Sequence, residues 1–287
     1  MKKIMVATDF SERSDRALRR AMLLARQFEA AVSLVHVVDD DQPRRIVEAE
    51  RQQAETLLRQ TGSTLRDSDG VACETRVVLA SPFAGIAQVV EAEAPDLLVI
   101  GPHRRQVLRD VFVGTTAERT IRSVDCPVLM VNAPPTGNYQ HVMQTTDLSE
   151  GSRTALERFS SLGLTGGIRN SLLYVFDAPA LRLAFSRSMQ KDEREEYLAA
   201  ERSEAAHRLA AFVEPARFAA AAPMIRHEAT TASHEILQAA ETEKADLIVL
   251  STHGQTGLAK LFIGSVTEQV LRMSPVDVLA IPPLRKG

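Results

Sequence analysis

The sequence lacks most of the features of a secreted, membrane or nucleic-acid-binding protein. Its 287 residues include two Cys and no Trp, and aromatic residues make up only 5%. A formal net charge of −3 gives no general attraction to nucleic acid, and few rings are available to stack on bases. No apolar run is long enough to cross a bilayer, and Asp9 interrupts the first one. We therefore expect a cytoplasmic protein that binds neither nucleic acid nor membrane.

Several motifs are also missing. Cys73 and Cys126 have no C-x-x-C spacing, so we expect two unpaired thiols. His227 and His234 lie seven residues apart without a Cys ligand or an H-E-x-x-H motif, and no metal site is expected. The chain has neither a Walker loop nor a G-x-G-x-x-G fingerprint, which excludes the commonest nucleotide-binding signatures.

What the chain does contain is a second copy of itself. The repeated residues include Thr8, Asp9 and Ser11, which recur 138 positions later as Thr146, Asp147 and Ser149. Beyond the middle of each copy the repeat continues at an offset of 150 positions, so the second copy carries 12 extra residues. A unit of this length can bury its own core, which predicts two domains, residues 1–133 and 139–287, on either side of a linker rich in Pro and Gly.

Strand and helix patterns alternate through both copies. Apolar runs typical of buried strands occur at residues 4–9, 32–38, 72–79, 96–100 and 127–131, and again at 141–147, 171–176, 224–229, 246–250 and 278–281. Helical patterns lie between them, and we assign the extra residues to the one at 191–213. This alternation predicts an α/β fold of two similar doubly wound domains, each with its own, mostly parallel five-stranded sheet and helices on both faces.

The loop after the fourth strand pattern of the second copy is the most informative motif. It contains Gly254 and Gly257, and Gly264 and Ser265 follow at the start of a helical pattern. Ligands of open α/β sheets bind beyond the carboxyl ends of the strands. Small residues let a phosphate approach the backbone, and the free N–H groups of a helix N-terminus favour an anion. The loop therefore predicts a phosphate-binding site.

On these residues the chain resembles the universal stress protein family in both copies. ATP-binding members carry G-x2-G-x9-G-[ST] after the fourth strand and an Asp after the first. Gly254, a nine-residue spacer, Gly264 and Ser265 match this motif, whereas Ser251 replaces its first Gly. The resemblance implies an ATP site, with Mg²⁺ neutralising part of the phosphate charge. Its candidate residues are Thr146, Asp147, Val175, Ser251, His253, Gly254, Gly264, Ser265 and Val266.

The first copy departs further from the motif. Its loop begins Gly101-Pro102-His103-Arg104, so that Arg104 occupies the position of the second Gly. A large side chain would lie where phosphates press against the backbone, and Pro102 removes an N–H donor. We expect this site to be closed to ATP or altered. The weaker candidates there are Asp9, Val37, Gly101, Gly114 and Thr115.

Structural explanations compete with ligand binding at several of these positions. Ser265 and Thr115 each begin an S/T-x-x-E pattern, which is typical of a capping box and needs no ligand. Asp9 and Asp147 are also typical of turns at strand ends. A cap does not explain Gly254, so we favour nucleotide binding in the second copy and a structural role in the first.

The resemblance implies a stress-response regulator that binds ATP mainly in its second copy. No nucleophile or general base accompanies His103 or His253 at a recognisable spacing, so we assign no catalytic residue. A slow ATP hydrolase and a nucleotide-free interaction module remain alternatives. The resemblance also implies that the last strands, residues 127–131 and 278–281, pair within the chain, and a homodimer is a further option.

Overall fold

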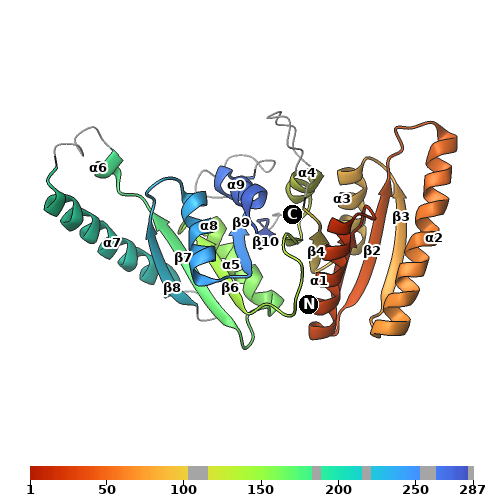
Figure 1. Ribbon diagram of the computed structural model, residues 1–287, viewed down its shortest axis with the longest axis horizontal. Helices are drawn as coiled ribbons and strands as arrows, with labels where there is room; N and C mark the ends of the chain where they lie inside the picture. Colours follow the sequence, from red (N-terminus) through yellow and green to blue (C-terminus); the bar gives the residue numbers. More distant parts are fainter. Residues whose placement is uncertain (103–115, 183–188, 215–220, 253–262, 284–287) are drawn as a thin grey trace. The chain divides into compact units, whose positions relative to one another are not determined.

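The computed structural model describes residues 1–102, 116–182, 189–214, 221–252 and 263–283 (Figure 1). The chain divides into two compact units. Unit 1 comprises Met1–Asn138, Leu258–Ile263 and Ser274–Gly287, and unit 2 comprises Tyr139–Gly257 and Gly264–Met273. The end of the second copy therefore groups with the first. Within the described residues, no helix is both long and apolar enough to span a membrane.

The sheet of unit 1 has the strand order β3-β2-β1-β4-β5-β10. Neighbouring strands from β3 to β5 are parallel, whereas β10 runs antiparallel to β5 with Leu279 opposite Leu129. The strands are β1 (Lys3–Ala7), β2 (Ala31–Val38), β3 (Cys73–Leu79), β4 (Leu97–Ile100), β5 (Val128–Met130) and β10 (Asp277–Ile281).

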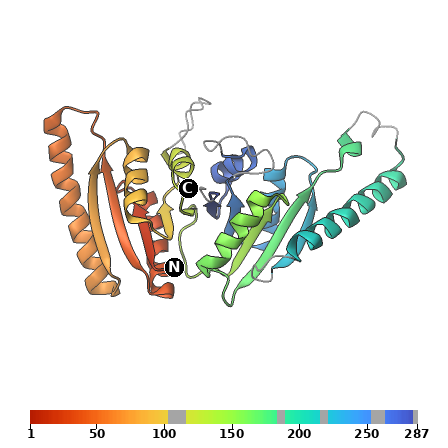
Figure 2. The same cartoon turned by 180° about the vertical axis from the view of Figure 1, so that it is seen from behind.

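Helices cover both faces of this sheet. In Figure 1, α1 lies in front of the strands, whereas in Figure 2 the other side of the sheet, with α3 and α4, faces the viewer. The helices are α1 (Glu12–Phe28), α2 (Arg44–Asp69), α3 (Pro82–Glu93) and α4 (Thr116–Ser123). Because each central strand is covered on both sides, its residues are apolar and almost fully buried, as Ile4, Met5 and Val6 of β1 illustrate.

Unit 2 repeats this arrangement around the order β9-β6-β7-β8, in which all neighbouring strands are parallel. Its strands are β6 (His141–Thr146), β7 (Arg169–Phe176), β8 (Ala222–His227) and β9 (Leu247–Ser251). Its helices are α5 (Glu150–Leu162), α6 (Pro179–Arg182), α7 (Lys191–Val213), α8 (Ala232–Glu243) and α9 (Ser265–Met273). The predicted α/β fold of two similar doubly wound units is confirmed.

Two expectations are wrong in detail. The copies do not form separate sheets, because β10 of the second copy pairs with β5 and so covers an edge whose backbone groups would otherwise lack partners. The expected pairing of the last strands is thus present. The extra residues of the second copy do not lengthen its helix, since α7 has 23 residues and α2 has 26. They lie on both sides of α7: residues 177–190, which include the short helix α6, precede it against 39–43 before α2, and residues 214–221 follow it against 70–72 after α2.

A repeated Asp holds the start of the first strand in each unit. Asp96 Oδ2 accepts the N–H groups of Lys2 and Lys3 at 2.5 and 3.0 Å. In unit 2 the two oxygens of Asp246 accept the N–H groups of Gln140 and His141 at 2.7 and 3.0 Å. These contacts account for the recurrence of this Asp without a ligand.

Gly101, just beyond β4, is required by a close approach of two backbones. A Cβ atom at this position would lie 2.8 Å from the carbonyl carbon and oxygen of Arg13 at the start of α1. Gly137, in the linker, has nothing within 4 Å of such an atom. We expect Gly101→Ala to destabilise the protein by about 1–3 kcal/mol, because backbone atoms cannot move aside as a flexible side chain can.

The matched control is Gly137→Ala, which should leave stability unchanged or raise it slightly. Urea unfolding followed by circular dichroism measures both, since the chain has no Trp to report by fluorescence. Equal unfolding midpoints for the two variants would show that α1 moves away from residue 101 without loss of stability.

Candidate functional site

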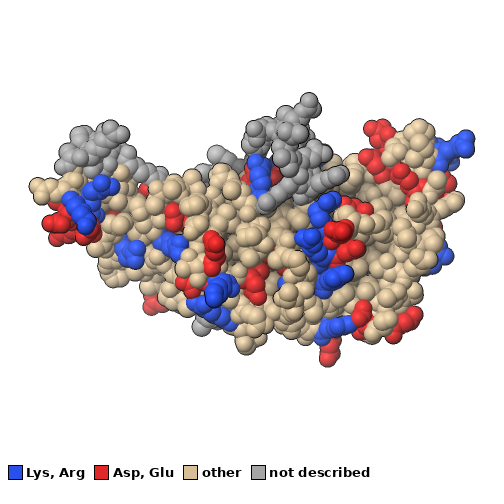
Figure 3. Space-filling model, in the orientation of Figure 1, with Lys and Arg blue, Asp and Glu red and all other residues tan. Residues whose placement is uncertain are grey.

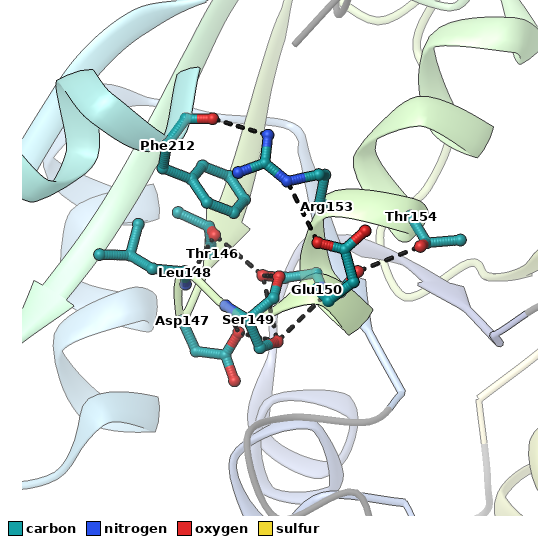
Figure 4. Close-up of polar contacts among 9 residues, drawn as sticks. Thr146, Asp147, Leu148, Ser149, Glu150, Arg153, Thr154 and Phe212 are labelled. Carbon is teal, nitrogen blue, oxygen red and sulfur yellow. Dashed lines mark hydrogen bonds and ion pairs between the residues drawn. The ribbon is translucent and has the colours of Figure 1, made fainter. Parts of the chain in front are cut away.

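The chain leaves β6 through a turn built from hydroxyl and carboxylate groups (Figure 4). The Thr146 hydroxyl lies 3.0 Å from that of Ser152 and accepts the Leu148 N–H at 3.0 Å. Asp147 Oδ1 accepts the N–H and the hydroxyl of Ser149 at 3.0 and 2.5 Å. The Ser149 oxygen in turn accepts the Ser152 N–H at 3.1 Å and so caps α5. The first turn of α5 is thereby fixed to the end of β6.

One residue of this turn has a left-handed backbone. Leu148 has a φ of 63°, and Phe10, its counterpart after β1, has a φ of 57°. This conformation costs on the order of 1–3 kcal/mol for a residue with a side chain, so it persists only where the surroundings impose it. Here the hydrogen bonds on either side of Leu148 impose it, and they aim Asp147 away from the strand.

The first copy builds the same turn. The Thr8 hydroxyl donates to Ser14 Oγ at 3.0 Å, and Asp9 Oδ1 accepts the Ser11 N–H at 3.0 Å. Burial raises the pKa of the Asp9 carboxyl, but hydrogen bonds from Ser11 and Ser14 and the charge of Arg13 outweigh burial and hold its pKa below the ordinary 3.8. Asp9 and Asp147 are therefore both turn-forming residues, whether or not either contacts a ligand.

The two ends of the candidate phosphate loop are tied together. At the end of β9, the Ser251 carbonyl accepts the Thr267 hydroxyl at 2.7 Å, and the Thr252 carbonyl accepts the Gly264 N–H at 2.9 Å. These bonds hold the start of α9 against the end of β9. Because β9 pairs with β6 in parallel, with Val249 opposite Gln144, this helix start lies at the same sheet edge as the β6 turn.

Helix α9 begins at Ser265. The Gly264 carbonyl accepts the Glu268 N–H at 2.9 Å, which is the first hydrogen bond of the helix and makes Gly264 its cap. Ser265 is exposed as the first helical residue. The capping-box interpretation of Ser265 is therefore wrong, because the cap position is taken by a residue that has no side chain.

Some predicted site residues lie outside the described part of the chain. In the second copy these are His253 and Gly254, and in the first copy Gly114 and Thr115. Val175 and Val37 are partly exposed and lie near the ends of β7 and β2, opposite Arg226 and Val78 of the neighbouring strands. Gly101 lies just beyond the end of β4.

The described candidates of the second copy therefore meet at the carboxyl edge of one sheet. Asp147 follows β6, Val175 lies near the end of β7, and Ser251 ends β9 next to Gly264. Since β7 and β9 flank β6 on opposite sides, this edge is the point where the strand order reverses. The arrangement combines a carboxylate, an apolar side chain and a helix N-terminus. In the described part of the chain, no group of three or more His, Cys, Asp or Glu could hold a metal.

Sequence reasoning missed Arg153, which joins α7 to the β6 turn. Its Nη1 donates to the Phe212 carbonyl at 2.9 Å, its guanidinium carbon lies 4.3 Å from the centre of the Phe212 ring, and its Nε lies 3.4 Å from Glu150 (Figure 4). Phe212 belongs to an apolar cluster that Leu148 packs against. The repeat gave no signal here, because the first copy has Asp15 at the equivalent position.

The chain belongs to the universal stress protein family, whose model matches residues 1–132 and 138–282. A universal stress protein of Methanocaldococcus jannaschii is 29% identical over 142 residues, which cover 46% of this chain and 83% of the relative. The crystal structure of one from Archaeoglobus fulgidus has a TM-score of 0.69 at 17% identity and covers 98% of both chains. A universal stress protein solved in complex with cAMP is 21% identical over 45% of this chain and 96% of its own, with a TM-score of 0.39.

The lowered pKa of Asp9 depends on Ser11 and can be tested by titration. A carboxyl whose pKa is lowered by folding stabilises the protein at pH values above its ordinary pKa of 3.8. This contribution is lost as the pH falls through the pKa of the carboxyl in the folded protein. Ser11→Ala removes the hydroxyl donor, so the pKa of Asp9 should rise toward 3.8. Carbon-detected NMR titration of the side-chain carboxyls measures this change.

The matched variant Ser149→Ala makes the same change in the second copy and should leave the pKa of Asp9 where it is. An unchanged pKa of Asp9 in Ser11→Ala would mean that the hydroxyl does not hold the carboxylate.

Proposed function

We propose that this universal stress protein is a cytoplasmic stress-response regulator that binds ATP mainly in its second copy and has no catalytic residue of its own. The adenosine end would lie near Asp147 and Val175, and the phosphates near Gly264, Ser265 and Val266. Ser251, His253 and Gly254 would complete the phosphate loop, and Thr146 would support Asp147 through the turn. The observation that carries this proposal is the glycine at position 264.

Nothing in the described fold requires a glycine there. Gly264 has no left-handed backbone, and among the described residues a Cβ atom would meet only the Thr252 carbonyl oxygen, at the ordinary contact distance of 3.8 Å. The contrast with Gly101 is direct, since Gly101 faces backbone atoms at 2.8 Å. A glycine at the cap of a helix that packing against the described residues does not need is what close approach of a ligand to the backbone requires.

The start of α9 also provides the charge complement of an anion. The first N–H groups of a helix have no partner within it, and most caps satisfy one of them with a side-chain oxygen. Gly264 has no such oxygen, whereas Ser149 satisfies α5 in this way at 3.1 Å. No side-chain oxygen of the described residues caps α9, so its N-terminus and the exposed Ser265 hydroxyl would serve as donors for a phosphate.

Only groups next to the site would attract the phosphates, and not a broad positively charged surface. Figure 3 shows acidic and basic side chains interspersed on one face of the molecule, without a broad region of one sign. Asp147 is unfavourable for phosphate but suits a ribose hydroxyl, which donates a hydrogen bond to a carboxylate. This chemistry favours placing the sugar at the β6 turn and the phosphates at α9, and Mg²⁺ would neutralise charge that the helix does not.

The first copy is less suited to ATP. Its Gly101 serves the contact between β4 and α1, so its presence does not indicate a ligand. The same contact suggests that Ser251, at the equivalent position in the second copy, alters helix packing rather than the phosphate site. Arg104 and Pro102 remain the sequence features that would close the first site.

We expect the wild-type chain to bind about one ATP, through its second copy. Arg104→Gly restores a small residue but leaves Pro102, so it should add at most a weak second site. Isothermal titration calorimetry of the nucleotide-free protein gives the stoichiometry. Two tight sites in the wild type would mean that Arg104 does not obstruct the first copy.

We also expect Gly264→Val to weaken ATP binding by about tenfold or more, because a branched side chain would crowd a phosphate at the helix start. Gly114→Val is the matched change in the first copy and should have little effect. Circular dichroism confirms that each variant is folded before titration. Equal losses of ATP affinity in the two variants would mean that the second copy is not the main ATP site.

The identity of the nucleotide needs an open test. Native mass spectrometry of freshly purified protein detects any retained nucleotide, and cAMP is included in the titrations because one relative was solved with it. Multiple-turnover phosphate release would instead indicate the slow hydrolase. If no nucleotide binds to a folded chain, the interaction-module alternative becomes the better account.

A further inference from the structure

A buried ion pair joins helix α1 to the last strand of the chain. Arg20 Nε lies 3.1 Å from Asp277 Oδ2, and the two side chains are 6% and 0% exposed. Arg20 lies on α1 and Asp277 begins β10, so the pair joins residues that are 257 positions apart in the sequence. Burying two charges is costly and is offset only when their geometry and remaining hydrogen bonds are good.

The remaining hydrogen bonds extend to the linker. Asp277 Oδ1 accepts the N–H groups of Asn132 and Ala133 at 3.0 and 3.1 Å. Arg20 Nη1 donates to the Gly137 carbonyl at 2.6 Å, and the Asn132 amide donates to the Val276 carbonyl at 3.0 Å. One cluster thus holds both the linker that follows β5 and the strand that pairs with β5.

The pairing of β5 with β10 is itself unselective. Leu129 lies opposite Leu279, and these two residues are equivalent in the repeat, with Met130 and Val128 opposite Val278 and Ala280. The β5 strand of a second chain, in the same register, would therefore place Leu129 opposite Leu129 and present a similar set of apolar residues. Backbone hydrogen bonds and apolar contacts do not distinguish these two partners.

Only one of the two partners carries the carboxylate. The repeat places Pro127 at the position of Asp277, so a second β5 would bring a proline next to Arg20. The guanidinium would lose its counter-charge, and the N–H groups of Asn132 and Ala133 would lose their acceptor. An uncompensated buried charge is strongly destabilising, so this cluster disfavours pairing of β5 with the β5 strand of a second chain.

We propose that Arg20 and Asp277 select the chain's own β10 over the β5 strand of a second copy, and so prevent a symmetric β5–β5 dimer. The ion pair then determines which strand pairs with β5, and not how stable the sheet is. This inference does not depend on nucleotide binding.

Disulfide trapping in the full-length chain tests the proposal. In a background with Cys73→Ala and Cys126→Ala, a single Leu129→Cys can form an interchain disulfide only when two β5 strands meet. With Arg20 and Asp277 present, oxidation should give almost none. Arg20→Met with Asp277→Leu removes both charges at similar volume and should raise the cross-linked fraction by about tenfold or more.

Arg158→Met is the matched control, because Arg158 is the counterpart of Arg20 in the second copy, and it should not raise cross-linking. The pair Leu129→Cys and Leu279→Cys should form an intrachain bridge, which verifies the register. If the double charge variant does not fold, Asp277→Asn is used instead, since it keeps the size but removes the counter-charge, and cross-linking should again increase. Equal cross-linking with and without the charges, or failure of the intrachain bridge, would overturn the proposal.

Discussion

The carboxylate of Asp147 accepts two hydrogen bonds from one residue, Ser149, and this fixes where α5 begins relative to β6. The candidate site depends on that contact. Parallel strands deliver their carboxyl ends to one sheet edge, and each must turn into a helix whose first N–H groups need partners. At β6 the chain satisfies them with its own serine. At β9 it places a glycine before α9, so one helix start at this edge is capped by a serine side chain and the other follows a residue that has no side chain.

Much of this architecture could be predicted from the sequence, because the repeat and the alternation of buried strands are local patterns. The turn-forming role of Asp9 and Asp147 was visible in the same way. The left-handed Leu148 was not, since no composition rule marks a leucine for φ of 63° and only the surrounding hydrogen bonds impose it. Arg153 was missed because its partner, Phe212, lies far along the chain on α7 and the repeat does not preserve the pair.

The pairing of β10 with β5 was expected from the family resemblance, but the residues of the strand itself do not specify it. Its apolar residues predict a buried strand but contain no information on which sheet will accept it. The deciding residue, Asp277, is a charge in a strand that is otherwise apolar, and its partner Arg20 looks like any other basic residue of α1. Long-range polar pairs of this kind are specified by geometry that one sequence does not reveal.

The two copies keep one turn but surround it differently. In the first copy, the Phe10 ring lies 4.4 Å from that of His36, centre to centre. In the second, Leu148 packs against a cluster that includes Tyr174, and Arg153 attaches the end of α7 beside it. The same turn therefore carries an aromatic pair in the first copy and a leucine packed against a mixed aliphatic and aromatic cluster in the second.

The place of β10 in unit 1 also has a consequence for biosynthesis. Strand β5 is translated before the second copy, and its partner β10 is the last strand of that copy. At the usual rate of synthesis, the β5 edge must wait on the order of ten seconds for that partner. During this interval the nascent chain exposes an unpaired, apolar sheet edge. Such an edge can pair with other chains and so promotes aggregation. Folding of unit 1 is therefore completed only after β10 has left the ribosome.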